Sequence, residues 1–244
     1  MKIALLGYGK MGKMIEEIIQ REGKHEVNLK VTSANRSNIT SSLLKNSDVA
    51  IDFSSPNAVE KNITLCLDAV VPLVIGTTGW YDDLEKVKSL CEEKNGALIY
   101  ASNFSIGVNI FFELNKKLAE LMKHRNEYEP RITEIHHAQK KDSPSGTAIS
   151  LARDILQSSA IKKQWVNHEK AMSDEVVILS RREGTIVGTH RIEYRSAVDR
   201  IEITHEAFSR EGFAQGAITA AEWIRDKKGF YEFREIILND TRFT

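Results

Sequence analysis

The sequence predicts an α/β protein that combines a parallel sheet and its crossover helices with a second, α+β unit. Over the first hundred residues, short apolar runs alternate with longer helical patterns, and this alternation is typical of a parallel sheet. After Asn103 the rhythm changes, and three strand-like runs later follow one another without intervening helices. A length of 244 residues suits one large domain or two modest ones, and we expect two.

The elements of the first unit follow from the period of the apolar residues. The predicted strands are residues 3–7, 27–32, 49–53, 73–75 and 98–100, and the predicted helices are residues 11–22, 56–68 and 82–94. In the second unit we expect a helix at 108–122, a strand at 131–136, a helix at 148–156 and strands at 176–180, 185–194 and 200–207. The least regular stretch is 158–174.

A strong helix pattern at 214–227 and a short apolar end at 230–238 complete the chain. We expect this end to return to the first unit, so that the chain crosses between the domains twice. The predicted domains are therefore residues 1–103 with 215–244, and residues 104–214.

Composition excludes several classes of protein. The 34 basic and 34 acidic side chains balance, so no overall field attracts nucleic acid or an anionic membrane. Cys66 and Cys91 each fall in an amphipathic helical pattern, which argues against a disulfide scaffold or a thiolate metal cluster. No apolar stretch has the length of a signal peptide or a membrane span, so we expect a cytoplasmic protein.

A glycine-rich turn directly after the first predicted strand indicates a dinucleotide site. Its residues are Gly7, Tyr8, Gly9, Lys10, Met11 and Gly12. This spacing permits a tight turn, close approach of a pyrophosphate to the backbone, and close packing of helix on strand. The helix start then offers free N–H groups to the phosphates. The alternative is a glycine-rich turn in a fold that binds no nucleotide.

The end of the second predicted strand bears on which nicotinamide cofactor binds. NAD-binding proteins usually place a carboxylate there for the ribose hydroxyls, but residues 32–37 contain none. Arg36 could instead bind a 2′-phosphate, since a guanidinium matches a phosphate well. We therefore predict NADPH or NADH as cofactor, with NADPH favoured. Alternatively, Arg36 is a solvated loop residue or stacks on the adenine of either cofactor.

Three further strand ends should face the same crevice, because ligands bind beyond the carboxyl ends of parallel strands. The candidate cofactor residues there are Phe53, Gly76, Thr77, Thr78, Ala101, Ser102, Asn103 and Phe104. Of these, Asn103 has a side chain that could bond the nicotinamide carboxamide. Taken singly, each of these segments is more often a plain turn.

Residues 134–147 hold a dense set of groups for proton transfer and anion binding. A histidine suits acid and base chemistry near neutral pH, and a nearby lysine supplies a proton or holds a carboxylate. His136 and His137 should point to opposite sides of a strand, so we expect no metal site. Ser145, Gly146 and Thr147 precede a helix and form a cradle for an anion, although ordinary N-capping is the simpler role.

The run from His136 to Ala148 closely resembles the signature of the dihydrodipicolinate reductase family. The resemblance extends over nearly the whole chain, through segments 7–12, 76–79, 102–109, 184–188 and 213–217. It implies a Rossmann-like cofactor domain, a mixed-sheet domain for substrate binding and oligomerisation, and usually a homotetramer. Two departures weaken any claim of NADH preference: the acidic residue after the second strand is missing, and Ser55 replaces a frequent arginine.

The resemblance also implies roles for individual residues. His136 corresponds to the proton donor and acceptor, Lys140 to a proton donor, and His137 to a substrate contact. Gly146 and Thr147 correspond to positions that hold a substrate carboxylate, with Ser145 beside them. The implied reaction is hydride transfer from NAD(P)H to C4 of the cyclic dicarboxylate (2S,4S)-4-hydroxy-tetrahydrodipicolinate, with loss of water. Two rival functions are another two-domain dehydrogenase and a non-catalytic NAD(P)H sensor.

Overall fold

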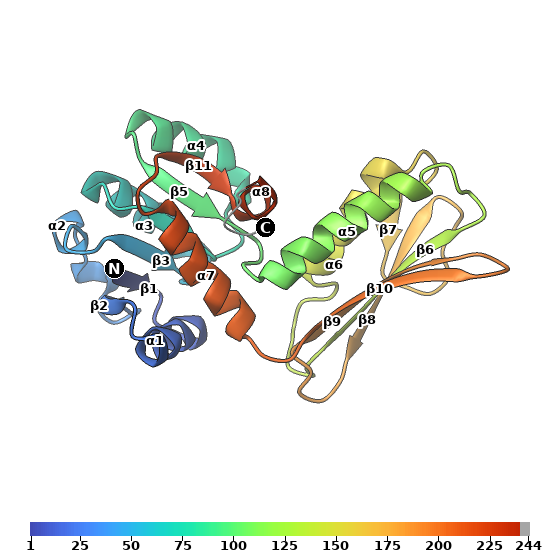
Figure 1. Ribbon diagram of the computed structural model, residues 1–244, viewed down its shortest axis with the longest axis horizontal. Coiled ribbons are helices and arrows are strands. Elements are labelled where there is room, and N and C mark those ends of the chain that lie inside the picture. The colour runs from blue at the N-terminus through green and yellow to red at the C-terminus, as the bar shows by residue number, and fades with distance from the viewer. Residues whose placement is uncertain (240–244) are drawn as a thin grey trace. The chain divides into compact units, whose positions relative to one another are not determined.

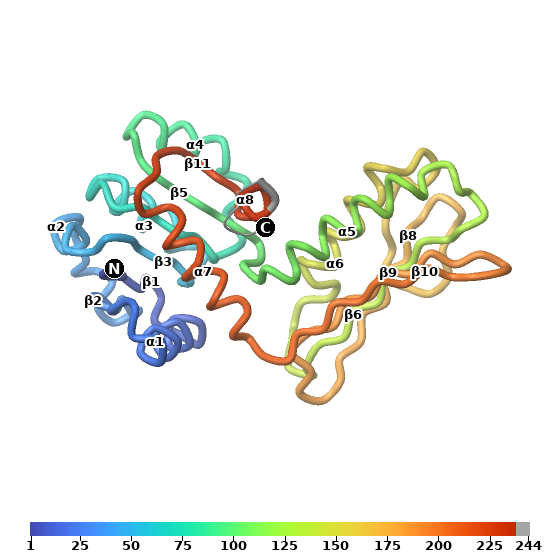
Figure 2. The backbone as a smooth tube through the Cα atoms, viewed as in Figure 1, coloured from blue at the N-terminus to red at the C-terminus, as the bar shows by residue number. Residues whose placement is uncertain are grey.

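The computed structural model describes residues 1–239 and divides the chain into two compact units. The first unit contains Met1–Ile106 and the segment that begins at Glu211, and the second is Gly107–Arg210. The sequence placed these borders a few residues away, at 103/104 and 214/215; residues 240–244 of the predicted first domain lie outside the described part. Figure 2 traces the chain out of the first unit after residue 106 and back into it at residue 211.

The first unit is built on a parallel sheet of six strands (Figure 1). In spatial order these are β11 (Gly229–Glu232), β5 (Ala97–Tyr100), β4 (Leu73–Ile75), β3 (Val49–Asp52), β1 (Lys2–Leu6) and β2 (Glu26–Val31). The inner strands are buried on both faces, and their sequences are accordingly continuous apolar runs rather than alternating ones. The carboxyl ends of all six strands therefore meet at one edge.

Helices cover both faces of this sheet. One core cluster joins it to α1 (Lys10–Glu22), α7 (Glu211–Ile224) and α8 (Phe233–Asn239). The other joins it to α2 (Ser41–Leu44), α3 (Pro56–Ala69) and α4 (Leu84–Glu93). Two short 3₁₀ turns, η1 (Arg36–Asn38) and η2 (Tyr81–Asp83), complete the unit. The return of the chain end to the first unit is thus explained by β11, which pairs with β5.

The second unit is a mixed sheet of five strands with two helices packed on it. Its order is β10 (Arg200–Ala207), β9 (Gly188–Arg195), β6 (Glu129–His136), β8 (Glu175–Arg182) and β7 (Gln164–Val166). The central strand β6 is antiparallel to β9 and parallel to β8. A single core cluster joins this sheet to α5 (Ile106–Met122) and α6 (Gly146–Ser158). The predicted fold class is confirmed.

The differences from the sequence expectation are local. The helix α2 and the strand β7 are missing from it, because each has only three or four residues and too few apolar positions to show a period. The strand expected at 185–194 begins at Gly188, since Gly184 has φ +48° and forms a turn before it. The helix expected at 214–227 runs from Glu211 to Ile224. Within residues 1–239, no helix has the length and apolar character needed to span a bilayer.

Candidate functional site

The first candidate site lies in the first unit, at the turn from β1 to α1. Gly7 has φ +98°, and a Cβ there would lie 2.3 Å from the carbonyl oxygen of Phe53, so only glycine fits. A Cβ on Gly12 would lie 2.7 Å from the carbonyl oxygen of Gly7. At Gly9, by contrast, a Cβ would meet no heavy atom of the described residues within 4 Å. The backbone at Gly9 is therefore open to a bound group, as a pyrophosphate requires.

The start of α1 adds hydrogen-bond donors to this opening. Its N-cap is Gly9, so within the described residues no side chain caps the first turn, and the N–H groups are left for a ligand. A pocket of about 300 Å³ lies beside it. The pocket is lined by Gly7, Tyr8, Gly9, Val31, Thr32, Ser33, Arg36, Phe53, Ser54, Ser55 and Asn62. These residues fit the phosphates and ribose of a dinucleotide, and the structure brings Arg36 to them.

Two other members of the glycine turn have partners within the protein. The Tyr8 hydroxyl donates a hydrogen bond to Glu16, whose second carboxylate oxygen lies 2.5 Å from Lys30 Nζ. The Lys30 ammonium also lies 5.0 Å from the centre of the Tyr8 ring. Met11 packs against the core, and Lys10 is exposed. The contacts of Glu16 and Lys30 were not predicted, since their positions look like ordinary surface charges in the sequence.

The strand ends of β3 and β4 are joined by a buried carboxylate. Asp52 accepts hydrogen bonds from Ser54 N, Asn62 Nδ2 and Thr77 Oγ1, all at 2.8 Å. The Thr77 hydroxyl in turn accepts from Ser54 N at 2.8 Å. This network holds the loop after β3, which carries Phe53 in the pocket lining. Asp52 thus has a structural task that the sequence did not predict.

The remaining predicted cofactor residues lie around this edge of the sheet. The Phe53 ring packs so closely on Gly76 that a Cβ there would lie 2.1 Å from it. Asn103 Oδ1 accepts a hydrogen bond from Ser105 N at 2.9 Å and so shapes the turn after β5. Ala101 and Phe104 are buried, whereas Thr78 and Ser102 are exposed. None of the segments 76–78 and 101–104 lines the pocket beside Gly9.

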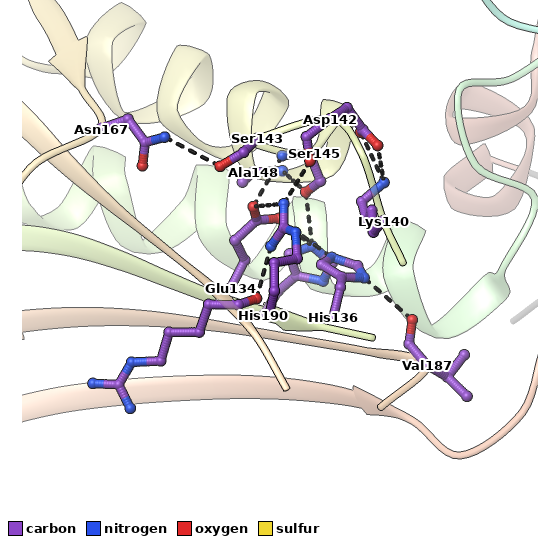
Figure 3. A network of polar contacts seen from close by, with 12 residues as sticks. Glu134, His136, Lys140, Asp142, Ser143, Ser145, Ala148, Asn167, Val187 and His190 are labelled. Atoms are coloured by element: carbon purple, nitrogen blue, oxygen red, sulfur yellow. Dashed lines mark hydrogen bonds and ion pairs between the residues drawn. The ribbon is translucent and has the colours of Figure 1, made fainter. Parts of the chain in front are cut away.

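The second candidate site lies in the second unit, on the central strand β6. Glu134 and His136 are two residues apart, so their side chains share one face of the sheet. His190 of β9 pairs directly with Glu134 across the strands. The rings of His136 and His190 meet edge to face, with centroids 5.1 Å apart. Figure 3 shows these three side chains gathered below the start of α6.

Glu134 is the centre of this cluster, and its side chain has no exposed surface. Oε1 accepts hydrogen bonds from the Ser145 backbone N–H and from Arg182 Nη2, each at 3.1 Å. Oε2 lies 3.3 Å from His136 Nε2 and 3.8 Å from His190 Nε2. Burial alone would raise the pKa of this carboxyl, but the groups from His136, Ser145 and Arg182 hold that pKa well below its ordinary value. Glu134 is therefore a buried anion.

The ring of His136 is fixed between two strands. Nδ1 lies 3.2 Å from the carbonyl oxygen of Val187, which can only accept, so Nδ1 carries a proton. The ring also packs on Gly188, where a Cβ would lie 2.9 Å from it; a larger residue would displace it. The second nitrogen, Nε2, faces the Glu134 carboxylate.

His190 is buried beside His136 and Glu134. Burial, followed by the neighbouring His136, lowers the pKa of His190 to about 3, so this ring is neutral. Its Nε2 lies 3.2 Å from Ser145 Oγ. That hydroxyl already accepts from Ala148 N, so its proton is available for His190.

The predicted anion cradle is the first turn of α6. Ser145 is the N-cap, and its hydroxyl accepts from Ala148 N at 3.2 Å, so the simpler capping role does apply to its side chain. Gly146 is exposed, and a Cβ there would meet no described atom within 4 Å. Thr147 is partly exposed. The helix start therefore offers N–H groups and open space, which suits a carboxylate.

The loop between β6 and α6 adds charged side chains. Lys140 Nζ contacts both carboxylate oxygens of Asp142, at 2.8 and 2.7 Å. Arg182 Nη2 donates to the carbonyl oxygen of Asp142 at 2.5 Å and so ties this loop to Glu134. His137 lies away from the cluster, with Nε2 at 3.3 Å from Arg210 Nη2. The structure thus brings His136, Ser145 and Lys140 to one region and gives His137 a different partner.

The ligand atoms of Glu134, His136 and His190 all lie within 4.8 Å of one another, a spacing that a metal ion can use. Two observations favour proton transfer instead. The Arg182 guanidinium already compensates the charge of Glu134. Lys140 is near enough to lower the pKa of His190. A metal ion added to these two cations would be repelled by them, so we retain the prediction of no metal.

Comparisons with known proteins match both units. A family model described as "Dihydrodipicolinate reductase, N-terminus" matches residues 1–104, and one described as "Dihydrodipicolinate reductase, C-terminus" matches residues 107–237. A relative from Christiangramia forsetii, named 4-hydroxy-tetrahydrodipicolinate reductase, is 48% identical over 237 residues, 97% of this chain and 98% of the relative. A protein of the same name from Thermosipho africanus is 37% identical over 239 residues, again 97% and 98% of the two chains.

A solved structure shows the same fold. It is the dipicolinate-bound dihydrodipicolinate reductase from Paenisporosarcina sp. TG-14, which is 24% identical to this chain. The superposition has a TM-score of 0.72 and covers 96% of this chain and 98% of the other.

Proposed function

The chain belongs to the dihydrodipicolinate reductase family, and we propose from this that it reduces 4-hydroxy-tetrahydrodipicolinate to tetrahydrodipicolinate in lysine and diaminopimelate biosynthesis. A nicotinamide cofactor supplies the hydride that C4 of the (2S,4S) substrate receives. The reaction also consumes a proton and releases water, so the protein must present an acid beside an anion site. The observation that carries the proposal is the cluster around Glu134, which joins His136 to the first turn of α6.

On the substrate side, we propose that the helix start at Ser145, Gly146 and Thr147 holds one carboxylate of the substrate. Lys140 and His137 would contact the substrate from the loop. His136 would provide the proton, because its ring is held in place by the carbonyl oxygen of Val187 and packs on Gly188 beside the start of α6. Lys140 would be a second proton donor.

On the cofactor side, we propose that Gly7, Gly9 and the start of α1 hold the pyrophosphate. Gly9 supports this, because its backbone is exposed and a ligand can approach it closely. The remaining proposed contacts are Tyr8, Lys10, Met11, Gly12, Phe53, Gly76, Thr77, Thr78, Ala101, Ser102, Asn103 and Phe104. Among them, Phe53 lines the pocket beside Gly9.

We also propose a preference for NADPH over NADH. Arg36 lines the pocket and is the basic residue available there for a 2′-phosphate among the described pocket-lining residues. Replacing Arg36 with Ala should raise the KM for NADPH and leave that for NADH nearly unchanged. Steady-state kinetics with each cofactor measures both KM values. If the ratio of the KM for NADPH to the KM for NADH is the same in the variant and the parent, Arg36 does not select the cofactor.

One coupled assay tests the function itself. The substrate is made enzymatically in the same cuvette, and oxidation of NADPH is followed by absorbance. Turnover that depends on this substrate supports the proposal. Oxidation with a different class of substrate points to another dehydrogenase, and cofactor binding without turnover points to a sensor.

The assembly is proposed as a homotetramer built through the second unit, and the location as the cytoplasm. The assembly rests on the resemblance to the family. Light scattering on the purified protein should give four times the mass of one chain.

A further inference from the structure

The buried carboxylate of Glu134 is not among the proposed substrate contacts, yet it contacts His136, His190, Arg182 and the backbone N–H of Ser145. It is fully buried, lies on the central strand, and faces the ring of His136 at 3.3 Å. Burial of a charge is unfavourable unless the charge is compensated, so a buried carboxylate at this position indicates a specific role. Its contacts with His136 and the start of α6 indicate which role.

Both ring nitrogens of His136 face hydrogen-bond acceptors. Nδ1 lies 3.2 Å from the carbonyl oxygen of Val187, and Nε2 lies 3.3 Å from Glu134 Oε2. Only the doubly protonated imidazolium offers a proton to each of them. Loss of the Nε2 proton would leave a lone pair facing a carboxylate. The arrangement therefore favours the form of His136 that donates a proton.

The proton on Nε2 is nevertheless not bound tightly in a hydrogen bond. Among the described residues, neither His136 Nε2 nor Glu134 Oε2 has a hydrogen-bond partner of good geometry, although the two atoms are in charge contact. Both atoms are buried, so this proton is held inside the cluster by charge rather than by an aligned hydrogen bond. Neutral His190 does not compete for it, because burial keeps that ring uncharged.

From these contacts, and resting on the proposed function, we infer that Glu134 is a positioning residue that keeps His136 protonated and holds its ring in place. The other oxygen of Glu134 holds the Ser145 backbone N–H, so the same carboxylate sets the acid relative to the first turn of α6 (Figure 3). Glu134 itself does not touch the substrate in this arrangement.

Charged and titratable groups of several elements lie around the pair of Glu134 and His136. Arg182 of β8 and His190 of β9 contact Glu134, whereas His205 of β10 and Lys140 of the loop before α6 are near enough to influence His190. Arg182 opposes Glu134 in sign, since its guanidinium compensates the carboxylate. Removal of the negative charge of Glu134 should therefore disfavour the protonated form of His136, and removal of the positive charge of Arg182 should favour it.

Two substitutions of similar size test this. In Glu134→Gln the charge is lost while the size is retained, so the alkaline limb of the kcat/KM profile should move to lower pH by about 1 to 3 units, the usual effect of one close charge. At a pH above that limb, kcat should fall roughly ten- to hundredfold while KM changes little. In Arg182→Gln the limb should move to higher pH. Opposite shifts cannot arise from a general loss of stability.

Two further variants are controls. Ser145→Ala removes the side-chain cap but keeps the backbone N–H that Glu134 holds, so KM should rise and the limb should stay. His205→Gln alters another partly buried histidine of the same sheet and should leave the limb unchanged. If Glu134→Gln does not fold, Arg182→Gln still tests the sign.

A second measurement does not depend on turnover. In the cofactor-free protein labelled with ¹⁵N-histidine, NMR follows the protonation of the His136 ring directly in the parent and in both variants. A His136 ring that titrates identically in the parent and in Glu134→Gln overturns the inference. Absence of turnover in the parent overturns the proposed function instead and leaves the NMR result to be judged separately.

Discussion

Replacing Gly9 with Ala separates a binding role of the glycine turn from a folding role. A Cβ at Gly9 would meet no described heavy atom within 4 Å, and φ is −96°, so the fold should accept it with a change in stability within about 0.5 kcal/mol. Cofactor binding should respond differently, because the methyl group would occupy the space through which a pyrophosphate approaches the backbone.

The expected loss of affinity follows from the hydrogen bonds at stake. A hydrogen bond from a backbone N–H to a charged group contributes about 1.5–3 kcal/mol. Loss of one such bond corresponds to a roughly 10- to 150-fold weaker Kd for NADPH. Calorimetric titration of the purified protein with NADPH measures this Kd, and thermal unfolding of the same samples measures stability.

Two other glycines provide the comparison. Gly7→Ala should destabilise the unit by several kcal/mol, because its Cβ would lie 2.3 Å from a backbone oxygen at φ +98°. Gly212→Ala, in the first turn of α7, places its Cβ at an ordinary 3.6 Å from Ser105 Oγ and should change neither quantity greatly. A folded Gly9→Ala protein that binds NADPH as tightly as the parent would refute the assignment of the pyrophosphate to this turn.

Three further predictions concern the second unit. His136→Ala should lower kcat by about 10²- to 10⁴-fold, the usual contribution of a general acid, and full retained turnover would remove this residue from the chemistry. Lys140→Met should lower kcat strongly whereas Lys141→Met should not; equal effects in the same assay would contradict the choice of Lys140. His190 has its pKa lowered from 6.5 to about 3 by burial, so the unfolded chain takes up a proton there first as pH falls. Its stabilising contribution is complete above about pH 6.5 and is lost between pH 6.5 and 3. In urea unfolding, the free energy of unfolding of His190→Gln should therefore depend less on pH over this range than that of the parent. Parallel curves for the two proteins would show that His190 does not cause the pH dependence.

Most elements of the first unit were predictable because they carry their signal locally, whereas the four residues of α2 are too few to show one. The strands β3 and β4 are continuous apolar runs, and the turn from β1 to α1 is specified by glycine spacing. The same locality explains what was missed there. The network around Asp52 joins residues up to 25 positions apart, and a carboxylate at a strand end gives no sign in the sequence that Thr77 is its partner.

The chemistry site was predictable only in part. The sequence indicated His136, Lys140 and the start of α6, since all lie within one short run. It assigned no role to Glu134, although period two along β6 puts Glu134 and His136 on one face of the sheet. It gave no indication of His190 or Arg182, because their contact with Glu134 depends on the register of β9 and β8 against β6.

That register has a chemical consequence that the local motif alone does not contain. On one side of β6, strand β9 places the neutral, buried ring of His190 beside Glu134, and on the other side β8 places the cation of Arg182 there. The two sides of Glu134 are therefore not equivalent. A shift of β9 by one residue would turn His190 to the other face of the sheet and leave Glu134 without its partner on that side. With His190 in place, His136 is the ring that lies closer to Glu134 Oε2, at 3.3 Å against 3.8 Å for His190. The proposed acid of this site therefore depends on the pairing of three strands, and the loop signature supplies the groups proposed to receive the substrate.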